Sequence, residues 1–194
     1  ERYEGKTLTR EEVEKIVKDA KDEELYPIIV TTVYTGLRKG EVMALKWKDV
    51  DVENRQIHVN GSLCRVVDEI PDENGVRHTT YQILEPKTKK SIRPIPMLEV
   101  VYEALMLQKK RQDVEKENNK WFYDDQDLVF TNPQGGYIAQ RAFMNKYHGF
   151  LKKYGITDIR FHDLRHTFAS LLIEADVSMK VIQELLGHST ITTS

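Results

Sequence analysis

The sequence predicts an α+β fold in which helices stand at both ends and a small antiparallel β-sheet lies between them. Apolar residues recur at helical spacing between Thr9 and Trp47, and again after Met97. Between these parts, β-branched runs alternate with turn residues, a pattern typical of short strands and hairpins. The length of 194 residues suffices for one solid core, so we expect residues 1–194 to form a single, mostly helical domain.

Three helices are expected before the sheet. The first has Thr9 as its N-cap and Glu12 three residues later, which is the pattern of a capping box. The second carries Pro27 in its first turn and is expected to end at Gly36 as its C-cap. A short third helix, "RKGEVMALKW", is expected to start near Arg38.

The middle of the chain predicts two hairpins and an edge strand. β-Branched residues on both sides of Glu53 and Asn54 indicate the first hairpin. The runs "SLCRVVDEI" and "VRHTTYQILE", joined by "PDENG", predict a longer hairpin over residues 62–85. The run "SIRPIPM" is expected to be an edge strand, because Pro94 and Pro96 cannot donate to a ladder.

Helices return in the last part of the chain. One is expected over residues 97–118, followed by a short extended piece at "DLVFTNPQGG". The run "YIAQRAFMNKYHGFLKKYG" predicts an amphipathic helix that ends at its last glycine. The next helix is expected to start from Thr157 or Asp158 and to contain "RFHDLRHTFASLLI". A last helix, "SMKVIQELLG", is expected to end at Gly187.

The composition excludes several classes of protein. The single cysteine, Cys64, excludes an internal disulfide and a multi-cysteine zinc site, and it fits a reducing cytosol. No apolar run approaches the roughly 20 residues that a membrane span requires. We therefore expect a cytoplasmic protein that has no membrane partner.

The charge of the chain is unevenly distributed. A net charge of −2 and a pI near 6.4 are unusual for a nucleic-acid-binding domain, which is normally basic. Residues 137–166, however, contain six Lys and Arg against two Asp, whereas residues 1–24 are acidic. Either a polyanion meets the basic face, or its charges form an ordinary solvated helix face.

The segment "HDLRH", residues 162–166, admits three interpretations. His162 and His166 have the spacing of a zinc-binding helix face, but an aspartate replaces the motif's glutamate and an arginine would adjoin the metal. Alternatively, Asp163 begins a helix and His166 is a partly buried, hydrogen-bonded histidine. In the third interpretation His162 and Arg165 bind phosphate together, because a guanidinium matches two phosphate oxygens.

Four motifs, in this order, resemble those of the tyrosine recombinases, and most closely the integrases of conjugative transposons and temperate phages. They are "TGLRKGEVMALKW", "EPKTKKSIRPIP", "RFHDLRHTFASLLI" and "ELLGHSTITT". The resemblance extends from about Thr7 to the end of the chain. It implies a mostly helical tyrosine-recombinase catalytic domain with a small antiparallel sheet and an extended hairpin.

The resemblance assigns roles to individual residues. Arg38 matches the family's first catalytic arginine, and Glu41 matches its acidic companion. His162 and Arg165 match the H-x-x-R pair, and His188 matches the histidine of the L-G-H motif. The family's catalytic lysine lies near the start of its turn, which favours Lys87 over its neighbours. Further DNA contacts are expected from four basic residues: Lys89, Lys90, Arg93 and Arg141.

The chemistry implied by the resemblance is transesterification at a DNA phosphodiester. A tyrosine hydroxyl would attack the phosphorus, leaving a 3′-phosphotyrosyl bond that stores the bond energy, so neither ATP, a metal nor another cofactor is expected. The arginines and His188 would stabilise the charge of the transition state. His162 would take the tyrosine proton, and Lys87 would protonate the leaving oxygen. The expected partners are double-stranded DNA and further copies of the chain, a tetramer on DNA.

The sequence departs from the family at its nucleophile. The family's tyrosine lies further beyond the L-G-H histidine than this chain extends, and residues 189–194 contain no tyrosine. All nine tyrosines lie at or before Tyr154. The chain as given is therefore expected to bind and pre-organise DNA without cutting it, as a piece that lacks both the tyrosine-bearing tail and the family's N-terminal DNA-clamping domain.

Alternative functions remain open from the sequence alone. A type IB topoisomerase uses the same set of arginines, lysine, histidine and tyrosine to nick and reseal one duplex. A DNA-binding module that has lost its nucleophile would share the fold, and a zinc hydrolase would use the H-x-x-x-H spacing. The hairpin over residues 62–85 is expected either to reach DNA or a neighbouring subunit, or to be a surface decoration.

Overall fold

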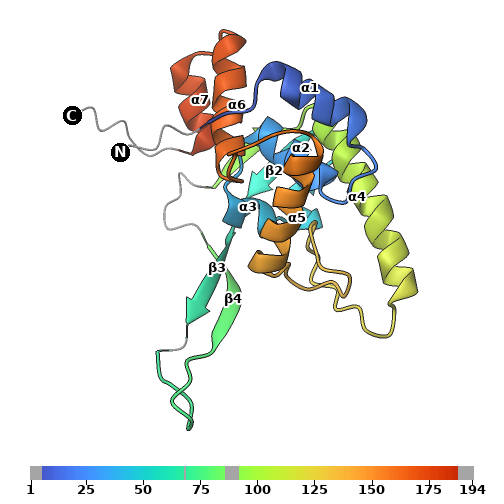
Figure 1. The fold of residues 1–194 in the computed structure, drawn as a ribbon, viewed down its shortest axis with the longest axis vertical. Helices are drawn as coiled ribbons and strands as arrows, with labels where there is room; N and C mark the ends of the chain where they lie inside the picture. The colour runs from blue at the N-terminus through green and yellow to red at the C-terminus, as the bar shows by residue number, and fades with distance from the viewer. Residues whose placement is uncertain (1–5, 68, 86–91, 188–194) are drawn as a thin grey trace, which may run out of the picture.

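The computed structural model describes residues 6–67, 69–85 and 92–187, and it confirms the predicted α+β architecture (Figure 1). Helices precede and follow a small set of antiparallel strands, as the sequence predicts. Within the described ranges the elements are α1 (Arg10–Asp19), α2 (Tyr26–Thr35), α3 (Lys39–Met43), the 3-10 helix η1 (Trp47–Asp49), β1 (Val50–Asp51), β2 (Gln56–Val59), β3 (Ser62–Val67), β4 (Thr79–Leu84), β5 (Arg93–Pro96), α4 (Glu99–Asn118), α5 (Gln140–Lys153), α6 (Asp163–Glu174) and α7 (Met179–Leu186).

Helix α2 lies at the centre of the molecule. Nearly all of its side chains are buried, and it packs against α1, α3, α4 and α6 (Figure 1). A helix that is apolar on all sides can be stable only when other elements surround it. The elements around α2 therefore share one hydrophobic core, to which both halves of the chain contribute.

The helix ends follow the local signals in the sequence. In α1, the Thr9 hydroxyl accepts from the Glu12 N–H at 3.2 Å, and the Glu12 carboxylate accepts from the Thr9 N–H at 2.8 Å, which confirms the capping box. Gly36 ends α2 and Gly187 ends α7, with φ angles of 64° and 67°. Glycine adopts this left-handed conformation without steric cost.

The main sheet has three antiparallel strands in the order β1-β2-β5. Its centre is the pair Ile57 and Ile95, which are both almost fully buried. Strand β5 lies at the edge, as the two prolines predict. Along β5 burial alternates, so Arg93 and Ile95 face the core while Pro94 and Pro96 are exposed.

Strands β3 and β4 form a separate two-stranded hairpin that projects from the body of the domain (Figure 1). Its base packs on α3, where a Cβ on Gly40 would lie 2.3 Å from the Ser62 hydroxyl and 3.0 Å from the Leu63 carbonyl. Only glycine at position 40 allows this close approach. No described residue between Ser62 and Glu85 is buried.

One expectation about the last part of the chain, the start of α6, needs correction. Helix α6 starts at Asp163, later than predicted. Asp158 has a φ of 60°, which is incompatible with a right-handed helix. The Asp163 carboxylate accepts from the Arg160 N–H at 2.8 Å, so residues 160–163 form a turn before the helix begins. The extended piece "DLVF" forms no strand. It pairs with the chain after α3 through one bridge, Lys46 with Leu128.

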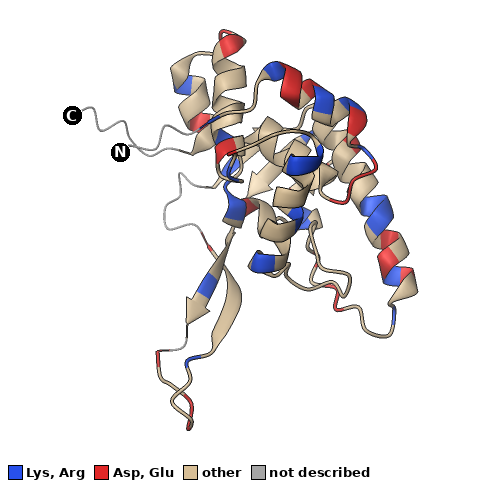
Figure 2. Ribbon diagram, in the orientation of Figure 1, with Lys and Arg blue, Asp and Glu red and all other residues tan. Residues whose placement is uncertain are grey.

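Ion pairs join the acidic start of the domain to its basic later part (Figure 2). Lys146 on α5 pairs with Glu24 at 2.5 Å, and Lys153 pairs with Glu23. Arg160 also pairs with Asp163 at 2.8 Å, so at least three of the six bases in residues 137–166 face acidic side chains of the same chain. No helix in the described ranges is both long enough and apolar enough to span a bilayer.

Candidate functional site

Arg38 and Glu41 form one unit at the start of α3. Arg38 is the N-cap, and its side chain remains 40% exposed. Glu41 is buried, and its carboxylate accepts from the Arg38 backbone N–H at 2.8 Å and from Arg38 Nη1 at 2.9 Å. Glu41 therefore fixes both the backbone and the guanidinium of Arg38.

Arg165 reaches the same region from α6. Its Nη1 donates to the Gly36 carbonyl at 2.6 Å, and its Nη2 donates to the Leu186 carbonyl at 2.5 Å. These carbonyls lie at the C-terminal ends of α2 and α7, where the helix dipoles favour a cation and the last carbonyls lack helical partners. Two helix ends thus hold a guanidinium whose side chain is nearly buried.

Arg93 is a third guanidinium in this cluster, and it contradicts the exposed position expected of a DNA contact. It is buried, and it donates to both Glu41 oxygens at 3.1 and 3.2 Å and from Nε to the Leu185 carbonyl at 2.6 Å. The signal was present in the sequence. Arg93 is two residues before Ile95 in a strand, so both must face the same side of the sheet.

The pKa values reflect this crowding of charge. Burial, together with the positive charges of Arg38 and Arg93, lowers the pKa of Arg165 to about 10, while the charge of Glu41 opposes this shift. Burial raises the pKa of Glu41, but the hydrogen bonds and charges of Arg93 and Arg38 outweigh it and keep the carboxyl below its ordinary value. The cluster therefore holds a net excess of positive charge around one ionised carboxylate.

His162 lies at the N-cap of α6, close to Arg165. Partial desolvation of its ring lowers the pKa of His162, and the charges of His166 and Arg165 lower it further. The rings of His162 and His166 pack edge-to-face, with 5.3 Å between their centroids. The expectation of a partly buried His166 is wrong, because its side chain is exposed on the solvent side of α6.

Of the remaining site residues that the sequence predicts, the structure describes only Arg141. Arg141 is exposed in the first turn of α5. The lysine turn and the L-G-H histidine, with Lys87, Lys89, Lys90 and His188, lie outside the described residues. Within the described ranges, no group of three or more His, Cys, Asp or Glu side chains gathers as a metal site would require.

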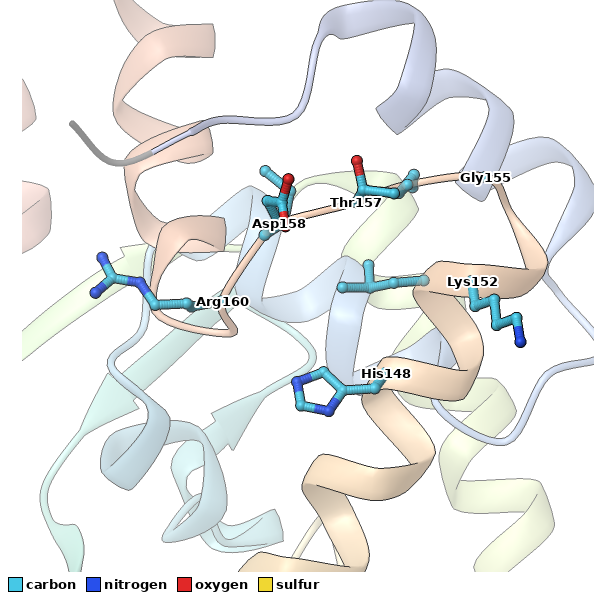
Figure 3. Close-up of a pocket in the computed structure, with 9 residues that line it drawn as sticks. His148, Lys152, Gly155, Thr157, Asp158 and Arg160 are labelled. Atoms are coloured by element: carbon cyan, nitrogen blue, oxygen red, sulfur yellow. The ribbon is translucent and has the colours of Figure 1, made fainter. Parts of the chain in front are cut away.

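A cavity of about 540 Å³ lies between α5 and the segment that leads to α6 (Figure 3). Leu151, Ile156 and Ile159 give it an apolar wall, while His148, Lys152 and Arg160 add basic groups. In Figure 3, His148 points from α5 into the space below the segment. None of the arginines of the cluster lines this cavity, so it is a separate feature of the surface.

The arrangement of the cluster suits a bound phosphate diester. Arginine carries five N–H donors in a planar fork, and Arg165 uses two of them on the helix ends. Arg38 is partly exposed beside it, and its guanidinium is oriented by Glu41. Guanidinium groups held by protein contacts can stabilise charge on phosphate oxygens without reorganising during a reaction.

Comparisons with known proteins find similar sequences and similar folds. Residues 6–194 match the family model described as "Phage integrase family". The chain is 35% identical over 191 residues to a "Tyrosine recombinase XerC-like" protein of Caldanaerobacter subterraneus subsp. tengcongensis, covering 96% of this chain and 48% of that protein. It is 31% identical to the "Transposase from transposon Tn916" of Enterococcus faecalis, covering 95% of this chain and 45% of the relative. The chain thus spans about half the length of these relatives.

Solved structures show the same fold. The chain superposes with a TM-score of 0.73 and 27% identity on the Tn1549 transposon integrase in complex with transposon right end DNA, covering 96% of this chain and 59% of that one. The XerA recombinase matches with a TM-score of 0.69 at 23% identity, covering 95% and 57% of the two chains, a similarity of fold alone.

Proposed function

Because this chain belongs to the phage integrase family and has the fold of a tyrosine recombinase catalytic domain, we propose that it cuts and rejoins double-stranded DNA as part of a longer site-specific recombinase. The reaction would proceed through a 3′-phosphotyrosyl intermediate during integration and excision of a mobile element. DNA and further copies of the protein, assembled as a tetramer on the duplex, would be its partners.

One observation carries the proposal. The guanidinium groups of Arg38 and Arg165 come together from α3 and α6, which are distant in the sequence. Arg38 donates a hydrogen bond to Glu41, whereas Arg165 donates to the Gly36 carbonyl and is affected by the charge of Glu41. Concentrating buried positive charge is costly unless an anion compensates it. Glu41 compensates part of this charge, and a scissile phosphate would compensate the rest.

The roles of the two arginines follow from their surroundings. Arg165 would bind a non-bridging phosphate oxygen from a fixed position, because two helix ends restrain it. Arg38 would bind the second oxygen from a partly exposed position. Each donor of this kind contributes about 3–4 kcal/mol to a transition state when it is pre-organised.

Proton transfer would involve groups beside the arginines. The lowered pKa of His162 keeps its imidazole neutral near pH 7, which is the form that accepts a proton from a tyrosine hydroxyl. Lys87 would donate a proton to the leaving 5′-oxygen, and His188 would donate a hydrogen bond to the phosphate. Lys89, Lys90 and Arg141 would contact the DNA backbone.

All nine tyrosines of the sequence lie at or before Tyr154, so none matches the family's nucleophile, and three buried or partly buried ones are also chemically unsuited to that role. Burial raises the pKa of Tyr26, and that of Tyr147 even more, so both hydroxyls resist ionisation. Burial likewise raises the pKa of Tyr34, which lines a separate hollow beside α1. We therefore expect the 194-residue chain to bind DNA without forming a covalent adduct, and the longer protein to form one.

A suicide duplex tests this proposal with the full-length protein. Its nick beside the scissile phosphate lets the cleaved fragment diffuse away, so the covalent adduct accumulates and is counted on a denaturing gel. Arg38→Ala and Arg165→Ala should each lower the rate of adduct formation by roughly 100- to 1000-fold. Arg10→Ala, which removes an exposed pair with Glu174, is the control and should react like wild type. Equal adduct from wild type and both variants would overturn the assignment.

A further inference from the structure

Arg93 makes contacts in two directions from the first residue of β5. Its Nη1 and Nη2 atoms donate to the two oxygens of Glu41 at 3.2 and 3.1 Å, a bidentate arrangement. Its Nε atom donates to the Leu185 carbonyl of α7 at 2.6 Å. The guanidinium therefore joins α3 to the end of α7, although these elements are distant in the sequence.

On the α3 side, the contact leads directly to Arg38. Glu41 Oε1 accepts from both Arg38 Nη1 and Arg93 Nη1, and Glu41 Oε2 accepts from the Arg38 N–H and Arg93 Nη2. A carboxylate shared in this way cannot shift towards one arginine without lengthening its bonds to the other. The orientation of the Arg38 guanidinium therefore depends on Arg93, which does not touch it in any contact described above.

On the α7 side, the contact fixes the point where the chain leaves the helix. Arg93 holds the Leu185 carbonyl, and Arg165 holds the next one, that of Leu186. Gly187 then turns the chain with a φ of 67°, and a Cβ there would lie 3.0–3.2 Å from Nη1, Cδ and Cζ of Arg93. Gly187 thus lies directly against the guanidinium of Arg93.

Burial separates the role of Arg93 from that of its neighbour. The Arg93 side chain is 6% exposed, against 40% for Arg38, so a phosphate that binds Arg38 is held away from Arg93 by the protein itself. Strand β5 also follows the segment that carries the three candidate lysines. Arg93 accordingly links β5 to α3 and to the end of α7.

We propose that Arg93 is a positioning residue which, through Glu41, couples the end of α7 to the orientation of Arg38. This inference rests on the proposed recombinase function. The end of α7 and the arginine at the phosphate then adopt their reactive arrangement together. When the end of α7 moves, Arg93 and Glu41 move with it and Arg38 loses its alignment, so DNA is bound without being cut.

The test uses the full-length protein, the suicide duplex and single-turnover conditions with saturating DNA. Arg93→Met removes the donors and keeps much of the side-chain volume. We expect the cleavage rate to fall roughly 10- to 100-fold, the range for a misaligned catalytic group, while the Kd for DNA changes less than about threefold. Arg93→Lys, which keeps the charge but loses the fork, should recover part of the rate. Arg10→Met is the matched control and should leave both quantities unchanged.

Combination with Arg38→Ala distinguishes positioning from general damage. If Arg93 acts through Arg38, the double variant Arg38→Ala/Arg93→Met should cleave no more slowly than Arg38→Ala alone. Multiplication of the two losses would overturn the proposal, and so would a rise in Kd for DNA with a smaller salt slope, which indicates a direct phosphate contact. If Arg93→Met does not fold by circular dichroism, the same comparison with Arg93→Lys decides.

The wild-type result separates this inference from the proposed function. Absence of any covalent adduct with wild type would overturn the recombinase function and this inference with it. A wild-type adduct that depends on Arg38 but not on Arg93 would leave the function standing and remove the coupling alone.

Discussion

The arginine cluster and the β3–β4 hairpin both contact α3, yet charged side chains are buried in the cluster and largely exposed in the hairpin. In the cluster, Arg93 and Arg165 are buried, and each is held by Glu41 or by helix-end carbonyls. In the hairpin, Arg65 and His78 are exposed, and Asp72, which pairs with His78, is partly exposed. Buried pairs respond strongly to the loss of one partner, whereas exposed pairs contribute little. The same residue types should therefore give very different results in the two regions.

Glycines with positive φ offer the sharpest contrast. A Cβ on Gly36 would lie 2.4 Å from Phe168 Cδ1 and 2.9 Å from Leu186 Cδ2, whereas a Cβ on Gly75 in the hairpin would meet nothing within 4 Å. Both substitutions cost about 1–2 kcal/mol for the left-handed backbone, and Gly36→Ala adds about 1–3 kcal/mol of overpacking.

Urea unfolding of the two glycine variants measures this difference. Gly36→Ala should lower the free energy of unfolding by about 2–5 kcal/mol, and Gly75→Ala by no more than about 2 kcal/mol. Equal losses would mean that the α2–α6–α7 junction is not tightly packed around Gly36.

Carboxylates provide the second contrast, through the pH dependence of stability. Hydrogen bonds lower the pKa of both Glu41 and Asp72 in the folded state. A lowered folded pKa stabilises the protein above the unfolded pKa, and this stability disappears as the pH falls through the folded pKa. Glu41→Gln should cost about 2–3 kcal/mol at pH 7, because charged hydrogen bonds to a buried group are lost.

The difference between wild type and Glu41→Gln should shrink as the pH falls below about 4.5 and through the lowered folded pKa of Glu41, because the protonated glutamate, like glutamine, carries no charge. Asp72→Asn should give the same direction with a much smaller amplitude, since the turn is solvated. Urea unfolding at several pH values gives these curves. A gap for Glu41→Gln that stays constant with pH would show that its charge does not support the cluster.

The smallest effect on stability is expected from removal of the hairpin. Cys64 pairs with Gln82, so an Asn-Gly turn can join them in place of residues 65–81. We expect the free energy of unfolding to change by less than about 0.5 kcal/mol, because the segment contains no buried residue among those described. DNA binding and recombination should fall if the hairpin reaches DNA or a neighbouring subunit, and unchanged values would make it a surface decoration.

The sequence predicts the features whose signals are local. Thr9 with Glu12, and the helix-ending glycines Gly36 and Gly187, act within one turn of the chain, so their spacing is sufficient. The turn "PDENG" likewise specifies the long hairpin. The motif around Arg38 and Glu41 was found for the same reason, because the two residues are one helical turn apart.

Features that depend on distant segments were missed. The burial of Arg93 arises from Glu41 and α7, and nothing near residue 93 indicates these partners except the alternation with Ile95. The exposure of His166 depends on which face of α6 meets α2. In the sequence, Gly40 stands out only as part of a motif. In the structure, its lack of a side chain leaves room for the base of the hairpin.

The central claim is that Arg38 and Arg165 neutralise the two non-bridging oxygens of one phosphate. The most direct test places a methylphosphonate at the scissile position of the suicide duplex, which replaces one charged oxygen by a neutral methyl group. An arginine that serves only to neutralise the missing oxygen is then dispensable. On this substrate, we expect the rate penalty of Arg38→Ala or Arg165→Ala to fall from roughly 100- to 1000-fold to less than about tenfold, according to which oxygen is replaced. An undiminished penalty for both variants, with both phosphonate stereoisomers, would contradict it.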